Sequence, residues 1–280
     1  MAWLYLLPGF LVYAVFLLYP LGRSVQISFF DWDGITLGRW VGLSNYAAVL
    51  TDDTLASAFG HAAVLVVFFA LVPLVVGLVA AAIIDRARVR GVGFFRTVIF
   101  LPQVIAMVAV GVAWRHVFEP DGPLNTALRR VGLGSWARAW LGEPGWALPS
   151  VGVVGAWVEI GLVTVLMLAA MSSIPRELYE AARLDGAGPV REFLAVTLPA
   201  VRSQVAVALT MTIIAALKTF DLVYVMTKGG PGHATTVPSY EVYHRAFELG
   251  RVGQAAAVGV VLTLVIFVIS VAVQRIGREG

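Results

Sequence analysis

Three ionisable residues inside long apolar stretches are the first features of this sequence that could do chemistry. Glu159 lies in one apolar run, and Lys218 and Asp221 lie in another. A charged side chain at the centre of a bilayer costs about 2.5–3.5 kcal/mol, so such residues normally face a bundle interior or a watery cavity. They indicate either a path for a polar solute or a structural ion pair in which Glu159 and Lys218 hold two helices together.

A compact charged segment, EAARLDGAGP (Glu180–Pro189), interrupts the apolar sequence. The sequence predicts a helix over Pro175–Leu184, because proline suits the first turn, where its missing N–H is not needed. Arg176 lies four residues before Glu180, and Arg183 lies three residues after it. This spacing predicts ion pairs along one helix face.

The end of the charged segment predicts a turn and a second short helix. Gly186 can end the first helix, and Pro189 can begin the next one. The small side chains of Ala181 and Ala182 leave a shallow face that another protein's groove could accept. From the residues alone, the segment over about 175–190 is either a solvated loop helix or a docking helix.

Several kinds of chemistry are excluded by the residue types. The chain has no cysteine, so disulfides, thiolate metal sites and cysteine nucleophiles are excluded. Its only lysines, Lys218 and Lys228, do not lie in a Walker A pattern, so the chain is not an ATPase. The histidines share no metal-ligand spacing: His61, His116, His233 and His244. We expect no catalytic residue, no metal and no cofactor in this chain.

The elements that must position these residues are transmembrane helices. The chain is 59% hydrophobic and 13% charged, with a mean hydropathy of +0.86, whereas a soluble domain is about 45–50% apolar and about 25% charged. A span needs about 20 apolar residues, and lipid admits helices rather than open strands. The fold class is an all-α membrane protein, read as a single domain over 1–280. Six spans are predicted, at about 4–27, 61–84, 95–117, 148–171, 203–226 and 253–275.

Charge gives little information about partners or orientation. The net charge of +3 is spread out, and no Lys/Arg cluster points to nucleic acid. The first apolar run starts at Trp3 without a basic segment before it, which favours a retained helix over a cleaved signal. Basic residues divide almost evenly between the two sides, so the positive-inside rule does not orient the chain, although the basic cluster over 86–96 leans inward.

Four segments resemble a known family. EAARLDGAGPVREFLAVTLP (Glu180–Pro199) resembles the signature of binding-protein-dependent ABC importer permeases, and its Asp-Gly-Ala version resembles the carbohydrate-uptake branch. WVGLSNYAAVL (Trp40–Leu50) and FLPQVIAMVAVGVAW (Phe100–Trp114) are similar to the family's segments after the first span and in the third span. Thr227–Ala257, which begins TKGGPG, resembles the last outer loop and the entry to the final span. The resemblance covers nearly the whole chain.

This resemblance implies a fold, a location and partners. The fold would be the six-helix type I (MetI-like) ABC importer permease fold in a bacterial plasma membrane, with the N-terminus and the 172–202 loop in the cytoplasm. The partners would be a second homologous permease, two ATP-binding subunits that carry ATP and Mg, and an extracytoplasmic solute-binding protein. The segment over about 175–190 would be a coupling helix that docks on an ATPase subunit. Its coupling residues would be Glu180, Ala181, Ala182, Asp185, Gly186 and Ala187.

The resemblance also implies a path for a sugar or oligosaccharide along the fourth and fifth spans. Its candidate lining residues are Trp157, Glu159, Thr212, Lys218, Thr219 and Asp221. The charge at Glu159 departs from the pattern known for maltose, which leaves the substrate open. Lys218 could instead attract an anion such as glycerol 3-phosphate. A secondary transporter is a weaker alternative because no internal repeat is visible, and an intramembrane enzyme has few candidate groups.

Overall fold

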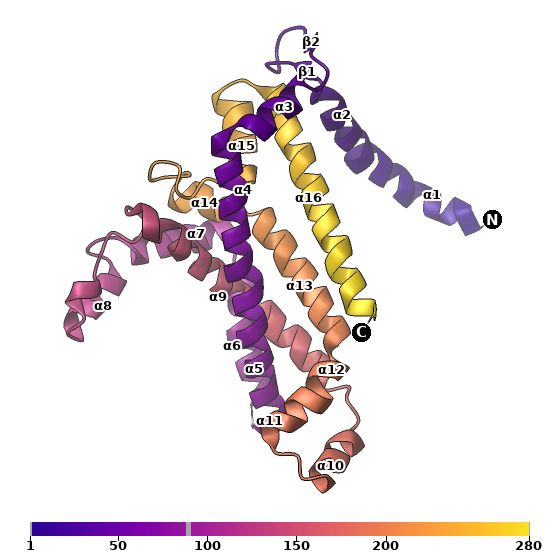
Figure 1. Cartoon of the computed structure of the whole chain (residues 1–280), viewed down its shortest axis with the longest axis vertical. Coiled ribbons are helices and arrows are strands. Elements are labelled where there is room, and N and C mark those ends of the chain that lie inside the picture. Colours follow the sequence, from indigo (N-terminus) through magenta and orange to yellow (C-terminus); the bar gives the residue numbers. More distant parts are fainter. Residues whose placement is uncertain (1, 88–90, 280) are drawn as a thin grey trace. The chain divides into compact units, whose positions relative to one another are not determined.

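The computed structural model describes residues 2–87 and 91–279, and almost all of their regular structure is helical (Figure 1). The predicted all-α class is therefore confirmed. The chain splits into two compact units. Two of the three boundaries fall inside α4 (Asp53–Val66) and α16 (Val252–Glu279), and the third lies just before α15 (Pro238–Tyr243). Unit 1 consists of Met1–Phe59 with Val237–Val265, and unit 2 consists of Gly60–Thr236 with Ile266–Gly280.

Unit 1 contains the N-terminal helices, a two-stranded ribbon, the start of α4 and the segment from α15 into α16. A short apolar cluster of Val49, Leu55, Ala257 and Val258 holds α3, α4 and α16 together. The two strands pair antiparallel, with Phe30 opposite Trp40. The elements are α1 (Ala2–Tyr13), the π-helix η1 (Ala14–Leu18), α2 (Tyr19–Ile27), β1 (Phe30–Asp31), β2 (Arg39–Trp40), α3 (Ser44–Thr51), the start of α4 (Asp53–Val66), α15 (Pro238–Tyr243), the π-helix η5 (His244–Glu248) and the first half of α16 (Val252–Glu279).

Unit 2 contains the helices that carry the candidate site residues. Its core joins α5, α9 and α13 through buried residues such as Ala81, Met167 and Ala208. The elements are the end of α4, the π-helix η2 (Val67–Leu71), α5 (Val72–Ala87), α6 (Val92–Val104), α7 (Met107–Val117), α8 (Pro123–Arg130), the 3₁₀ turn η3 (Gly134–Trp136), α9 (Pro144–Met171), α10 (Arg176–Leu184), α11 (Pro189–Glu192), the π-helix η4 (Phe193–Thr197), α12 (Leu198–Ala200), α13 (Arg202–Leu217), α14 (Asp221–Met226) and the end of α16.

Helix α9 is the central helix of unit 2, because small residues let its neighbours approach closely. A Cβ at Gly155 would lie 2.0 Å from the Phe69 ring of η2. A Cβ at Gly161 would lie 2.4 Å from the Ile99 carbonyl oxygen of α6. Small residues allow this kind of close backbone approach between apolar helices. The two glycines are therefore packing positions.

The predicted spans are confirmed in number only if one bent pair of helices counts as a span. Among the described residues, five helices are long and apolar enough to cross a membrane, and the bent pair makes six. The third predicted span, 95–117, corresponds to two helices rather than one, since α6 and α7 meet at 94°. Ile105 and Ala106 have extended backbones there, shortly after Pro102. Hydropathy averaged over a window does not detect a break of two apolar residues.

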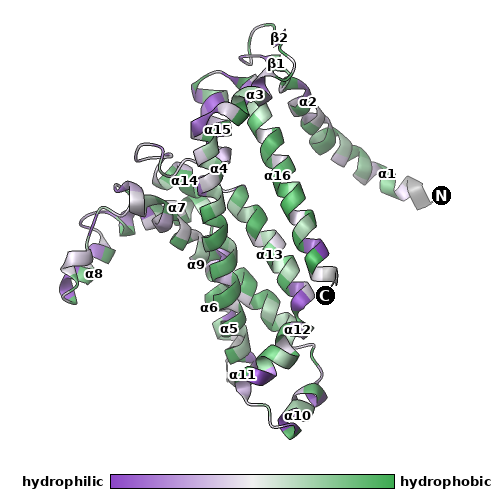
Figure 2. Ribbon diagram, viewed as in Figure 1, coloured by the Kyte–Doolittle hydropathy of each residue, from purple (hydrophilic) through white to green (hydrophobic). Residues whose placement is uncertain are grey.

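The fifth predicted span, 203–226, is also interrupted. Helix α13 ends at Leu217 and α14 begins at Asp221, although together they are apolar enough for one span. Figure 2 shows apolar residues along α5, α9 and α13 and hydrophilic residues near α8 and α10. The break therefore lies within the apolar part of unit 2, where interrupted helices expose backbone groups only if protein or water surrounds them.

Candidate functional site

The charged segment forms the predicted helix, turn and second helix. Pro175 is extended and immediately precedes α10 rather than lying in its first turn, so that prediction is off by one residue. Gly186 has a φ of +78°, and the N–H of Ala187 donates to the Ala182 carbonyl, which closes the helix as a Schellman-type turn. Pro189 then occupies the first position of α11, as predicted.

The six candidate coupling residues lie together on or just after α10, which has no buried residue. Glu180, Ala181, Asp185 and Gly186 are exposed, and the two other alanines are partly buried. Leu184 is 90% exposed. A short helix with charged residues and two exposed leucines, Leu178 and Leu184, presents a mainly polar surface that includes apolar side chains.

The ion pairs predicted within α10 do not form. Arg183 Nε lies 2.9 Å from Glu192 Oε1 in α11, and neither Arg176 nor Arg183 is ion-paired with Glu180 in the described part of the chain. The hydrogen bond and the charge of Glu192 raise the pKa of the Arg183 guanidinium. Spacing along one helix could not reveal a partner in the next helix.

Along the fourth span, an aromatic contact joins α9 to α7. The Trp157 ring lies 5.6 Å from the Trp114 ring in an edge-on geometry, and Trp114 in turn contacts Phe118 at 5.4 Å. Trp157 remains 38% exposed. Aromatic faces of this kind are suited to apolar ring surfaces, including the faces of sugars.

Glu159 is buried without a complete set of partners. It is 3% exposed, and its Oε2 accepts no hydrogen bond. Lys218 is exposed, and no ion pair between Glu159 and Lys218 occurs in the residues that the structure describes. The alternative of a structural pair between these two residues is therefore not supported. A buried carboxylate oxygen without a partner is costly unless it is satisfied at some stage.

The fifth-span candidates fall into two groups. Thr212 is buried inside α13, where its hydroxyl donates to the Ala208 carbonyl at 2.9 Å. Lys218, Thr219 and Asp221 lie at the interruption between α13 and α14, and Thr219 is buried whereas the two charged residues are exposed. The structure thus gathers three of the four candidates at one helix break.

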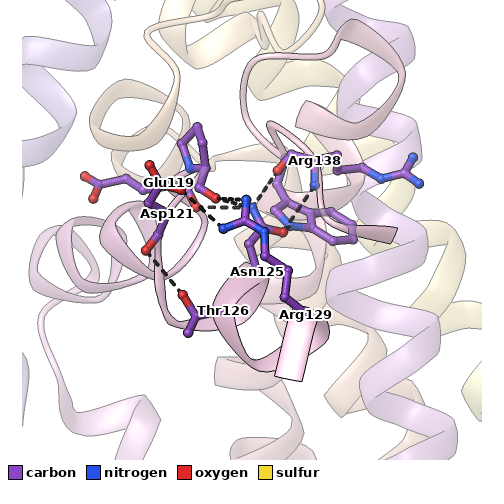
Figure 3. A network of polar contacts seen from close by, with 8 residues as sticks. Glu119, Asp121, Asn125, Thr126, Arg129 and Arg138 are labelled. Atoms are coloured by element: carbon purple, nitrogen blue, oxygen red, sulfur yellow. Dashed lines mark hydrogen bonds and ion pairs between the residues drawn. The ribbon is translucent and has the colours of Figure 1, made fainter. Parts of the chain in front are cut away.

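A polar network that sequence reasoning missed organises the loop between α7 and α9 (Figure 3). The Asn125 amide is 1% exposed and donates to the Glu119, Pro120 and Arg138 carbonyls, while its oxygen accepts from Arg138 N–H and Trp140 Nε1. Asparagine in a polar loop gives no signal in the sequence. Arg138 also stacks over the Trp146 ring at 4.3 Å.

A second missed cluster lies in unit 1 around Arg245. Its guanidinium donates to Glu241 Oε2 at 3.0 Å, to Gln254 Oε1 at 3.3 Å and to Asp52 Oδ2. Although burial opposes ionisation, the hydrogen bonds from Arg245, Leu55 N–H and Thr54 N–H keep the pKa of the Asp52 carboxyl below its usual value. The four-residue spacing of Glu241 and Arg245 was a readable signal for one part of this cluster.

Among the described residues, no group of three or more His, Cys, Asp or Glu side chains could hold a metal ion. The site therefore consists of a helix bundle with a buried carboxylate, an aromatic pair and an interrupted helix, together with an exposed charged helix at one end of unit 2 (Figure 1). Such an arrangement is suited to binding and moving a solute.

Comparisons with known proteins agree with this description. The family model of the binding-protein-dependent transport system inner membrane component matches residues 74–278. The probable ABC transporter permease protein YurN of Bacillus subtilis is 34% identical over 99% of this chain and 96% of its own length. The diacetylchitobiose uptake system permease protein NgcF of Streptomyces coelicolor is 35% identical over 95% of this chain and 79% of its own length.

A solved structure has the same fold. It is a bacterial alginate ABC transporter in complex with an alginate pentasaccharide-bound periplasmic protein, with a TM-score of 0.83 at 24% identity over 99% of this chain and 94% of that chain.

These findings define a membrane transport subunit with the permease fold of ABC importers. The chain belongs to the family of binding-protein-dependent transport system inner membrane components. It is a permease subunit of an ABC importer and not itself an enzyme. The resemblance of its charged loop and outer segments to this family is therefore confirmed.

Proposed function

We propose that this permease imports a sugar or oligosaccharide, and the similarity to NgcF carries the proposal. NgcF is named for diacetylchitobiose uptake, and it is 35% identical to this chain over 279 residues. The glycerol 3-phosphate alternative rested on Lys218, whose exposed side chain has no comparable support from the named relatives. A neutral saccharide is the better proposal.

In this proposal, the solute path follows α9 and the break between α13 and α14. Trp157 provides a ring face, and the bare Oε2 of Glu159 accepts a hydrogen bond from a sugar hydroxyl. Thr212 lines the path from α13, and Lys218, Thr219 and Asp221 provide polar groups at the break. A site built around a hydroxyl donor discriminates against solutes that lack one, because its acceptor then stays unpaired.

The proposed assembly follows from the family and from the neighbouring structure. Permeases of this kind work with a second permease and two ATP-binding subunits, and the alginate transporter was solved with a periplasmic protein. We propose the same partners here, in a bacterial plasma membrane with a cytoplasmic N-terminus. Both units then belong to one transmembrane domain, since the family match at 74–278 runs through parts of each.

The exposed helix α10 is the proposed docking element for an ATP-binding subunit. Its residues Glu180, Ala181, Ala182 and Asp185, with the turn at Gly186 and Ala187, form the contact surface. Replacement of Gly186 by Trp should remove the turn, because a φ of +78° strongly disfavours a side chain. We expect ATPase-subunit capture and uptake to fall together, and unchanged capture would contradict the docking role.

The substrate class is tested with the purified complex in liposomes. ATP hydrolysis is measured with the cognate binding protein and a panel of diacetylchitobiose, other saccharides and glycerol phosphates. Stimulation by a saccharide supports the proposal. Stimulation by glycerol 3-phosphate alone contradicts it, and solute uptake that continues without ATP indicates a secondary transporter.

A further inference from the structure

Two side-chain contacts join α10 to the segment that follows it. Tyr179 Oη lies 3.0 Å from Thr197 Oγ1, and Arg183 Nε donates to Glu192 Oε1 at 2.9 Å. Tyr179 and Arg183 are four residues apart on α10, so they lie on the same helix face. The two contacts therefore lie next to each other between the two helices.

The partner residues lie on the same side of their helix because of its geometry. Residues Phe193–Thr197 form the π-helix η4, which directly follows Glu192. A π-turn closes over five residues rather than four, so Glu192 and Thr197, which are five apart, lie about one turn from each other. In an ordinary α-helix these two side chains would point in clearly different directions.

The residues on the two sides of these contacts differ in burial. Glu192 is 3% and Thr197 is 5% exposed, whereas the Arg183 side chain is 59% exposed. Helix η4 and its continuation are fixed to the core of unit 2, where Phe193 and Leu198 pack against the buried apolar cluster. Helix α10 has no buried residue of its own. Two polar side-chain contacts attach it to this packed segment.

The covalent connection between the two helices does not fix their angle. Residues 185–188 include Gly186, which has a φ of +78°, and Gly188, which is extended. Because glycine has no side chain, both positions can adopt other backbone conformations at little steric cost. A cavity of about 50 Å³ lies beside these two contacts, and its lining includes Tyr179, Glu192 and Thr197. This volume accommodates water. Without these two contacts, α10 could therefore change its angle to α11 by backbone rotation within residues 185–188.

We propose that the Tyr179–Thr197 and Arg183–Glu192 contacts form a clamp that makes α10 and α11–η4–α12 one rigid lever, which transmits movement of the docked helix to the span beginning at α13. The clamp rests on the proposed docking of α10. Its four members are positioning residues: they set how far a displacement of α10 moves the span. The proposed docking surface consists of other residues, on α10 and in the turn directly after it.

The chain offers a direct test because it has no cysteine. Spin labels are placed on Cys at two exposed positions, Glu177 in α10 and Val207 in α13. Distances between the labels are measured in the complete complex, without nucleotide and with ATP, Mg and vanadate. This measurement requires no transported sugar.

The clamp predicts one narrow distance distribution in both nucleotide states of the unmodified lever. Tyr179→Phe removes one hydroxyl, and Glu192→Gln removes one charge, with little change in shape. Each should broaden or shift the distribution with ATP. The double variant Arg183→Gln with Glu192→Gln should be no worse than the more affected single variant, because the two residues share one contact. Arg191→Gln, an exposed neighbour in α11, is the matched control and should change nothing.

A functional measurement accompanies the distances. Solute moved per ATP hydrolysed should fall at least about fivefold in Tyr179→Phe and Glu192→Gln, while capture of the ATPase subunit stays at the unmodified level. Unchanged distance distributions in both variants overturn the clamp. Capture of the ATPase subunit tests the docking proposal, and the distances between the spin labels test the clamp. Loss of capture in Gly186→Trp, but not in the clamp variants, therefore separates the two proposals.

Discussion

Glu159 in α9 and Glu241 in α15 are both only 3% exposed, yet they lie in opposite electrostatic surroundings. Glu241 is bonded to Arg245, which also binds Asp52 and Gln254. Glu159 has an oxygen with no hydrogen-bond partner. Burying a charged group is tolerable only when it is paired and hydrogen-bonded. Glu241 therefore stabilises unit 1 through its pairing with Arg245, whereas for Glu159 we propose that a ligand satisfies the unpaired oxygen.

The largest expected effect comes from removing the cation at Arg245. Arg245→Ala leaves the buried Glu241 and the partly buried Asp52 without their shared partner, and breaking a buried pair costs about 3–5 kcal/mol. The fraction of folded protein after heating, measured by size-exclusion chromatography in detergent, should fall at lower temperature. Arg251→Ala, an exposed neighbour, should have little effect. Equal stability of Arg245→Ala and Arg251→Ala would contradict a structural role for the Arg245 cluster.

The opposite outcome is expected at Glu159. Glu159→Gln keeps the shape and removes the charge, so thermal stability should stay the same or rise. Transport should fall roughly tenfold or more, because a hydrogen bond to a charged group contributes about 1.5–3 kcal/mol. Uptake and thermal stability are measured on the same preparation. A loss of stability without a specific loss of uptake would place Glu159 with Glu241 as a structural residue.

A smaller effect tests whether the ion cluster around Arg245 itself stabilises unit 1, or whether only an unpaired buried charge destabilises it. We expect the triple variant Asp52→Asn, Glu241→Leu and Arg245→Met to recover more than half of the stability lost in Arg245→Ala. Apolar replacement of a whole buried ion cluster is often neutral. The Asn side chain at position 52 can still accept from Thr54 N–H and so cap α4. Recovery in thermal midpoint checks this prediction, and failure to recover would mean that the cluster itself stabilises the fold.

The sequence predicted those parts of the fold that depend on local patterns. The apolar runs predicted the helices, and the residues Gly186 and Pro189 predicted the turn after α10 because their backbone preferences are intrinsic. The 94° bend at Ile105 and Ala106 was not predictable, since both residues are apolar and neither is a glycine or proline. Pro102 was a signal for irregularity but not for the direction of the bend.

The candidate sites show the same limit. The positions of Glu159 and Lys218 inside apolar runs were readable, but the lack of an ion pair between them in the described part of the chain was not. The spacing of Glu241 and Arg245 was readable as a helical pair. Their link to Asp52 joins residues 193 positions apart, so it depends on how α4, α15 and α16 pack in unit 1. Arg183 likewise has its partner beyond a turn, in α11 rather than in its own helix.

The smallest expected effect is the pH dependence of the Arg245 cluster. Asp52 has a pKa below its usual value of 3.8, mainly because hydrogen bonds from Arg245, Leu55 and Thr54 outweigh the effect of burial. A depressed folded-state pKa stabilises the fold above the unfolded value, and this contribution disappears as the pH falls through the folded pKa. The difference in thermal midpoint between the unmodified protein and Asp52→Asn should therefore be full above about pH 5 and shrink below about pH 4. Because Arg245 stays protonated throughout this range, a difference that is independent of pH would mean that the Asp52 charge contributes nothing to the cluster.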